Sequence, residues 1–200
     1  ATSKLRTIDD LITIGTLGFR GEALSSISAV SRISLTTRGR GEALGTQLRV
    51  EGGRLLEEGS VGAPVGTVIS VENLFFNTPA RLKFLKKQST EKRHITQVIT
   101  RYALAYPGIR FTLEHDGREV FRSSGSGQLA DVMVRVVGLD NFKHMIEIDS
   151  VDAGRDDRPT VNVRGFASLP DLSRSDRTQI ALFVNGRYIQ DSNLTYAVIQ

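Results

Sequence analysis

The stretch Gly15-Thr-Leu-Gly-Phe-Arg-Gly-Glu-Ala-Leu24 is the starting point for predicting this fold. Two glycines, Gly18 and Gly21, come directly before helix-forming residues whose apolar positions recur at helical spacing. A glycine turn that leads into a helix leaves backbone N–H groups unpaired, and the helix dipole adds positive potential there. The pattern is therefore compatible with a phosphate-binding loop. By itself it is more typical of a plain connection between two elements.

The composition is that of an ordinary globular protein, with 200 residues, 40% hydrophobic and 24% charged. No apolar run reaches the roughly 20 residues that cross a membrane, and no signal peptide opens the chain. The absence of cysteine excludes disulfides and thiolate metal sites, and the three histidines lack metal-ligand spacing. Because the chain starts without methionine and stops within an apolar helical pattern, we expect it to be part of a longer protein.

Positive charge is concentrated in one window of the sequence. The net charge of the whole chain is +4, whereas residues 81–101 carry seven basic residues and one acidic residue. The rest of the chain is therefore slightly acidic. A basic patch of this kind can bind nucleic acid.

The first 125 residues predict helices, then a strand-rich region, then a further long helix and a β-hairpin. We expect a short helix after Thr7, a second helix ending near Val30, and a final helix capped by Thr90 and stopped by Pro107-Gly108. That final helix should bury one stripe formed by Ile95, Val98, Ile99, Tyr102 and Tyr106. Thr78-Pro79 predicts a further helix start. Strands are predicted at 31–37, 46–50 and 66–71, with hairpin turns at Gly52-Gly53 and Asp116-Gly117.

A second, smaller α/β unit is expected after the glycine-serine segment 123–127, which has the composition of a linker. Its predicted elements are a helix at 129–137, strands near 145–148, 160–166 and 179–184, an Asn185-Gly186 hairpin turn and a last helix capped by Ser192. The fold class is therefore α+β, with domains at 1–125 and 126–200.

Four segments together resemble the MutL family of DNA mismatch-repair ATPases, which shares a superfamily with gyrase B, Hsp90 and the histidine kinases. They occur in the family's order and approximate spacing: Thr2-Ser-Lys4, Gly18-Phe-Arg-Gly-Glu-Ala-Leu24, Leu74-Phe-Phe-Asn-Thr-Pro-Ala-Arg81 with Lys83-Phe-Leu85, and Val184-Asn-Gly-Arg187. The resemblance implies part of an ATP-binding α/β sandwich, followed by a truncated domain like that of ribosomal protein S5. Membership of the gyrase or Hsp90 branches disagrees with Asn77-Thr-Pro-Ala-Arg81, which belongs to the repair branch.

The resemblance also implies nucleotide-binding residues. Thr67 matches a threonine near the adenine, although a plain strand residue with a satisfied hydroxyl is the alternative. Arg20 could add charge or be structural, and Glu22 is interpreted as a first-turn helix residue rather than a catalytic one. The other implied contacts are at the start of the ATP lid (Thr2, Ser3 and Lys4) and in the loop that wraps the triphosphate (Gly18, Phe19, Gly21, Ala23 and Leu24).

The family's catalytic groups are expected outside this chain. The general-base glutamate, the Mg²⁺-binding asparagine and the aspartate that reads adenine should lie upstream, and the lysine that reaches the γ-phosphate should lie downstream. We therefore expect ATP and Mg²⁺ as the cofactors of the intact protein, with no catalytic residue and no metal ligand within residues 1–200.

The basic patch gains a DNA-binding interpretation from the resemblance, because the family binds DNA without strong sequence preference. Lys86 falls where the family presents a basic residue to the DNA backbone, and Arg187 is a second candidate. Lys92 and Arg93 share the patch, and all of these charges could instead be solvated surface. Aromatic residues do not interleave with them, so a base-stacking groove is poorly supported. The expected DNA-binding residues are Arg81, Lys83, Lys86, Lys87 and Arg187.

Two functional hypotheses remain at this point. The first is a cytoplasmic molecular switch, nucleoid-associated if bacterial, that forms a homodimer on ATP binding and engages DNA. It would also meet the mismatch-recognition protein MutS and a downstream nuclease or helicase. The second is a DNA-binding scaffold whose nucleotide chemistry has been removed. Titrations with nucleotide and with DNA would separate them.

Overall fold

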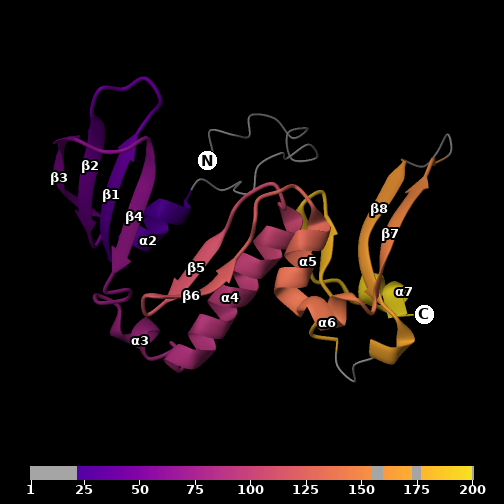
Figure 1. The fold of residues 1–200 in the computed structure, drawn as a ribbon. Coiled ribbons are helices and arrows are strands. Elements are labelled where there is room, and N and C mark those ends of the chain that lie inside the picture. The colour runs from indigo at the N-terminus through magenta and orange to yellow at the C-terminus, as the bar shows by residue number, and fades with distance from the viewer. Residues whose placement is uncertain (1–21, 155–159, 173–176, 200) are drawn as a thin grey trace. The chain divides into compact units, whose positions relative to one another are not determined.

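The computed structural model describes residues 22–154, 160–172 and 177–199 (Figure 1). The chain divides into two compact units, residues 1–86 and 87–200, each of which is described by itself. The predicted first helix after Thr7 and most of the predicted phosphate loop lie outside the described residues.

The first unit contains a four-stranded antiparallel sheet with the strand order β3-β2-β1-β4. Its turn at Gly52-Gly53 has φ angles of 54° and 81°, so the predicted hairpin is confirmed. The elements are α2 (Ala23–Ser28), β1 (Arg32–Arg38), β2 (Gly45–Glu51), β3 (Arg54–Val61), β4 (Gly66–Glu72) and α3 (Pro79–Leu82).

One face of this sheet is apolar because side chains alternate along each strand. Ile33 and Leu35 of β1 face the same way as their partners Val71 and Ile69 of β4. Ile33 is 7% exposed, the most buried apolar side chain described in this unit. Helix α2 lies beside the end of the sheet where β1 begins and β4 ends (Figure 1).

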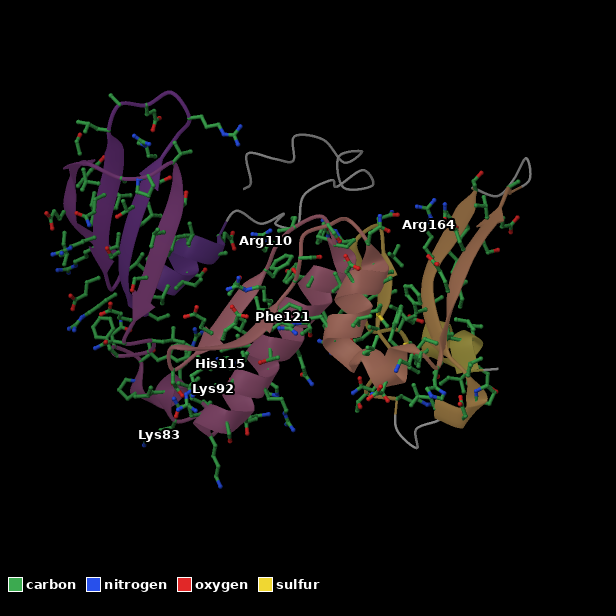
Figure 2. All side chains as sticks on the ribbon, viewed as in Figure 1. Lys83, Lys92, Arg110, His115, Phe121 and Arg164 are labelled. Carbon is green, nitrogen blue, oxygen red and sulfur yellow. The ribbon has the colours of Figure 1, made fainter. Side chains whose placement is uncertain are left out.

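The second unit has its core where helix α4 (Gln88–Ala105) meets the hairpin of β5 (Thr112–His115) and β6 (Arg118–Arg122) and helix α5 (Leu129–Val137). Ala103, Phe121 and Val132, one from each of these three parts, form the buried cluster. Figure 2 shows Phe121 on this hairpin. The predicted hairpin turn is confirmed, since Asp116 and Gly117 have φ angles of 51° and 72°.

The remaining elements of the second unit are short. Gly138 ends α5 as predicted, with a φ of 85°, and Asn185-Gly186 forms the predicted turn with φ angles of 49° and 74°. Two antiparallel ribbons pair β7 with β8 and β9 with β10. The bounds are α6 (Leu139–Phe142), β7 (Met145–Asp152), β8 (Val161–Ser168), η1 (Pro170–Leu172), β9 (Leu182–Val184), β10 (Arg187–Ile189) and α7 (Ser192–Ile199).

Several predicted helix details are wrong. Helix α4 begins two residues before Thr90, at Gln88. Asp191 rather than Ser192 caps α7, because its Oδ1 accepts a hydrogen bond from the Leu194 N–H at 2.8 Å. Thr78 does precede Pro79 at the start of α3, but its side chain makes no capping bond.

The predicted apolar stripe of α4 is only half correct. Ile99 packs against the core, whereas Ile95 and Val98 are 48% and 46% exposed. The buried line of the helix instead runs through Ala103, which is fully buried. A small alanine allows the hairpin and α5 to approach the helix closely, and sequence spacing does not reveal that.

The predicted linker at 123–127 is anchored at its two ends, although Ser124, Ser126 and Gly127 are exposed. Ser123 is 2% exposed, and its Oγ accepts from the Phe111 N–H at 2.9 Å and donates to the Ile109 carbonyl. The Gly127 N–H donates to the Pro107 carbonyl at 3.1 Å. These hydrogen bonds fix Ser123 and Gly127, whereas amino-acid composition alone predicts a flexible segment. The domain division at 125/126 stays a prediction.

Among the described helices, none combines the length and apolar character that crossing a lipid bilayer requires.

Candidate functional site

The structure describes only the last part of the predicted phosphate loop. Thr2, Ser3, Lys4, Gly18, Phe19, Arg20 and Gly21 lie outside the described residues. Glu22 is the N-cap residue of α2, and Ala23 and Leu24 form its first turn. All three are exposed. Glu22 thus lies one residue before the predicted first turn; its backbone carbonyl accepts from the Ser26 N–H at 2.9 Å, and its side chain makes no capping bond.

Thr67 lies on β4 directly opposite Thr37 of β1. The two side-chain oxygens are 2.8 Å apart, and Thr37 Oγ1 also lies 3.3 Å from the Gly66 carbonyl as a donor. If Thr37 donates to that carbonyl, its lone pairs are left to accept from Thr67. The pair is on the sheet face that carries Ile33 and Leu35. Strand alternation could have indicated Thr37, but its pairing with Thr67 could not be read from sequence.

The first unit presents its predicted DNA-binding cations in and after α3. Arg81 is in the last turn of this helix, and Lys83 is its C-cap residue. Both are exposed, as is Lys86. Figure 2 shows Lys83 in this segment. Phe84, between these cations, is 84% exposed and was not predicted to be part of a site.

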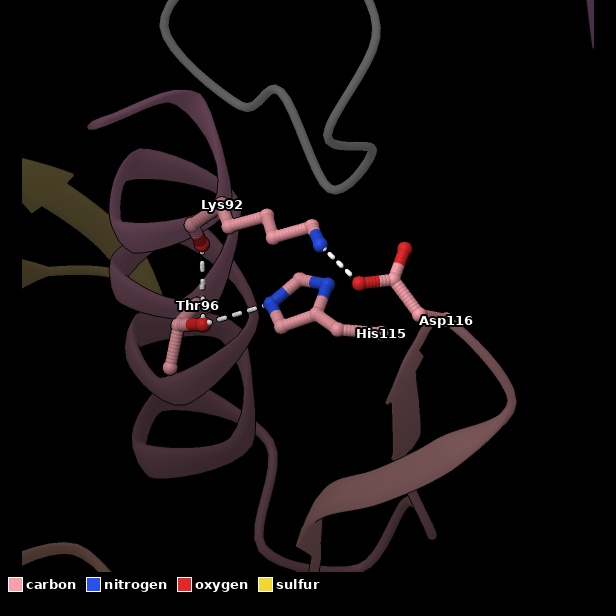
Figure 3. A network of polar contacts seen from close by, with 4 residues as sticks. All are labelled: Lys92, Thr96, His115 and Asp116. Carbon is pink, nitrogen blue, oxygen red and sulfur yellow. Dashed lines mark hydrogen bonds and ion pairs between the residues drawn. The ribbon is translucent and has the colours of Figure 1, made fainter. Parts of the chain in front are cut away.

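In the second unit, Lys87 is the exposed N-cap residue of α4. Lys92 takes part in a network of polar contacts between α4 and the β5–β6 hairpin (Figure 3). The Lys92 ammonium forms an ion pair with Asp116 in the turn between β5 and β6. Thr96 Oγ1 donates to the Lys92 carbonyl at 2.9 Å, so its lone pair accepts from His115 Nε2 at 3.1 Å. The Lys92 side chain is 27% exposed. In the structure Lys92 therefore tethers α4 to the hairpin, and its place in a DNA-binding patch stays a prediction.

The same ion pair changes the acidity of Asp116. The hydrogen bond from Lys92, together with its positive charge, lowers the pKa of the Asp116 carboxyl below its ordinary value. A lowered pKa in the folded state means that the pair stabilises the fold above the pKa of the unfolded chain. That stabilisation is lost as the pH falls through the lower, folded-state pKa, in the acid range below about pH 4.

Replacing Lys92 with methionine is expected to raise the pKa of Asp116 back towards its ordinary value, because both lowering effects leave with the ammonium. The measurement is an NMR titration of the Asp116 carboxyl carbon in the 200-residue chain. Lys143→Met is the matched control, since its ammonium lies 3.3 Å from a different carboxylate, Asp140. An Asp116 pKa unchanged by Lys92→Met would contradict the tether.

Arg187 begins β10, directly after the Asn185-Gly186 turn, and is half-buried. The hairpin contacts α4 at two points. The Arg101 guanidinium lies 3.9 Å from the centre of the Tyr188 ring, in cation–π geometry. Gly186, which has a φ of 74°, approaches Tyr106, and a Cβ at this position would lie 2.8 Å from the Tyr106 hydroxyl oxygen. The pairing of Arg101 with Tyr188 depends on tertiary structure, and no sequence pattern indicates it.

Comparison with known proteins identifies similar sequences along the whole chain. The family model for the "DNA mismatch repair protein, C-terminal domain" matches residues 133–200. The DNA mismatch repair protein MutL of Streptococcus mutans is 45% identical over 199 residues, and MutL of Streptococcus pneumoniae is 46% identical over the same length. The chain spans about 30% of the length of these curated relatives.

Solved structures show the same similarity in three dimensions. The ATPase domain of Aquifex aeolicus MutL in complex with ADP superposes with a TM-score of 0.73 at 33% identity, covering 97% of this chain and 70% of that one. A second structure of the Aquifex aeolicus ATPase domain gives a TM-score of 0.68 at 30% identity. Because this identity extends over nearly the whole chain and over more than two thirds of the Aquifex aeolicus ATPase domain, the chain belongs to the MutL family of DNA mismatch-repair proteins and corresponds to part of its ATPase-domain region.

Proposed function

We propose that this chain is part of an ATP-driven switch that binds DNA during mismatch repair. The observation that carries the proposal is the fold shared with an ADP-bound MutL ATPase domain over nearly the whole chain. The phosphate contacts are assigned to Gly18, Phe19, Arg20, Gly21 and the first turn of α2, with Thr2, Ser3 and Lys4 at the start of the lid. Thr67, supported by Thr37, is assigned to the adenine side.

Magnesium is the expected companion of ATP in the intact protein. Among the described residues, no three His, Cys, Asp or Glu side chains come together in a cluster that could hold a metal ion. The base that activates water and the magnesium ligand are expected upstream of this chain. The role left to residues 1–200 is to hold the nucleotide phosphates and to connect them to a DNA-binding surface.

The DNA-binding role is assigned to Lys86 and Arg187, with Arg81, Lys83 and Lys87 as further phosphate contacts. Their exposure or part-exposure supports this role. Within the described parts of the chain, Arg81, Lys83 and Lys87 form no ion pair with a carboxylate, which leaves them available to phosphates. ATP binding is proposed to drive dimerisation with a second copy and to engage MutS and a downstream nuclease or helicase, in the bacterial cytoplasm near the nucleoid. The alternative, a DNA-binding scaffold without nucleotide chemistry, rests on the same exposed cations.

The 200-residue chain is expected to bind duplex DNA but to show no Mg²⁺-dependent ATP hydrolysis above the buffer background, because the expected base lies outside it. The measurement is phosphate release with and without Mg²⁺ on the sample used for a DNA titration. A nucleotide titration of the same sample separates the two functions: binding of ADP supports the switch, and DNA binding without nucleotide binding supports the scaffold. A measurable Mg²⁺-dependent turnover rate would refute the assignment of the catalytic groups.

A further inference from the structure

The C-terminal end of α2 is held by donors from much later in the chain. Backbone carbonyls at the end of a helix have no partner within it. Here four successive carbonyls, those of residues 28–31, each accept a hydrogen bond from outside the helix, and we call this set the α2 junction. Its bonds run from Gly53 N to Ser28 O at 2.8 Å, Asn77 Nδ2 to Ala29 O at 2.9 Å, Phe75 N to Val30 O at 2.6 Å and Gly52 N to Ser31 O at 3.2 Å.

Two parts of the first unit supply these donors. One is the Gly52-Gly53 turn, where glycine permits the positive φ angles. The other is the segment 73–77, in which Asn73 and Phe75 have φ angles of 52° and 66°. A bulky aromatic residue rarely adopts this left-handed conformation, and such strain persists where the surroundings impose it, often at functional sites. The bond from Phe75 N to Val30 O ties the strained residue to the α2 junction.

The segment 73–77 leads directly into the basic helix α3. Thr78 is the N-cap residue of α3, and the Arg81 N–H donates to its carbonyl at 2.9 Å. Asn77 therefore stands immediately before α3 in sequence while its side chain is bonded to the end of α2, 48 residues away. One side chain thus connects the helix that follows the phosphate loop to the helix that carries Arg81.

Asn77 differs from the other three residues that donate to the α2 junction in the chemical group that it donates. Gly52, Gly53 and Phe75 donate through backbone amides, which a side-chain substitution does not remove. Asn77 donates through its side-chain amide. An aspartate has nearly the same shape, but its ionised carboxylate has only acceptor oxygens, which would face the Ala29 carbonyl. The bond can therefore be deleted without a large change in volume.

We propose that Asn77 is a positioning residue through which the nucleotide loop and the DNA-binding cations of the first unit influence each other. The proposal rests on the ATP switch and DNA binding described above. A nucleotide that fixes α2 also fixes the start of α3 through the α2 junction, so the affinity for DNA depends on bound nucleotide. By thermodynamic linkage, DNA changes the nucleotide affinity by the same factor.

The test measures the dissociation constant for a fluorescent DNA duplex with and without a non-hydrolysable ATP analogue and Mg²⁺, in the complete gene product that carries residues 1–200. The ratio of the two constants is the coupling factor, and factors of about 5 or more are typical of allosteric proteins. Asn77→Asp and Asn77→Ala are each expected to bring this ratio about twofold or more closer to one, because the solvent-exposed bond from Asn77 to Ala29 is lost in both.

Asn73→Asp is the matched control, because it makes the same chemical change in the same segment at a residue whose side chain does not bond to the α2 carbonyls. It should keep the wild-type ratio. A cooperative thermal transition in each variant shows that the ratio is measured on folded protein. A wild-type ratio of one would overturn the proposed switch and this inference together. A wild-type ratio that differs from one and survives both Asn77 substitutions would overturn the role of Asn77 alone.

Discussion

Replacing Lys86 and Arg187 with glutamate is expected to weaken duplex DNA binding at least about tenfold at moderate salt, whatever the DNA sequence. Each cation that contacts a phosphate releases counterions, so the logarithm of affinity falls linearly with the logarithm of salt concentration. Losing two contacts should reduce the magnitude of that slope by about 2. The measurement is fluorescence anisotropy on several duplexes over a range of salt concentrations.

The control for this double variant is Lys143→Glu with Arg164→Glu, which changes the net charge by the same amount. Lys143 follows α6, and Arg164 lies on β8 beside Asp149; neither was assigned to DNA. Figure 2 shows Arg164 on its ribbon. Equal losses in the two double variants would mean that total charge governs binding rather than the proposed residues. An unchanged affinity and salt slope in Lys86→Glu with Arg187→Glu would exclude both as phosphate contacts.

Truncating Phe121 to alanine is expected to have the largest effect on stability, lowering the free energy of unfolding by about 3–5 kcal/mol. Phe121 is 5% exposed and packs with Ala103 and Val132, which are both fully buried. Its removal leaves a cavity between α4, the β5–β6 hairpin and α5, and the loss of transfer free energy adds to the cost of that cavity. Urea unfolding followed by circular dichroism measures the change.

Val120→Ala provides the comparison, because Val120 precedes Phe121 on the same strand and is 49% exposed. Its substitution should change stability by no more than about 0.5 kcal/mol. The difference between these neighbours tests whether the cluster with Ala103 and Val132 is the core of this unit. Similar losses for Phe121→Ala and Val120→Ala would show that it is not.

Local sequence patterns correctly predicted the turns and helix ends that depend on the backbone conformation of one or two residues. Asp116-Gly117 and Asn185-Gly186 predicted tight hairpin turns because few residues adopt the positive φ angles that such turns need. Gly138 predicted the end of α5 for the same reason. The four family segments predicted the MutL family, which the comparisons confirm, because they are specific in both residue type and order.

Amino-acid composition did not predict the surroundings of residues whose hydrogen-bond or ion-pair partners lie in a different segment of the chain. The composition of the glycine-serine segment 123–127 predicts a flexible linker. Its first residue, Ser123, is nevertheless buried, and its hydroxyl group accepts from the Phe111 N–H and donates to the Ile109 carbonyl. Lys92 reads as one more cation of an open patch, yet Asp116 neutralises it across the hairpin. The partners of Ser123 and Lys92 lie 12 or more residues away along the chain, and local sequence patterns do not indicate contacts over such separations.

By itself, the sequence determined the family, the turns and most of the helices and strands, because steric limits on φ and the alternation of apolar residues act over a few positions. Only the tertiary structure decided which groups meet: Thr37 with Thr67, Lys92 with Asp116, and the end of α2 with Asn77. These contacts form where the fold brings a donor and an acceptor from distant segments within hydrogen-bonding distance, and the spacing of residues along the sequence does not show which segments those are.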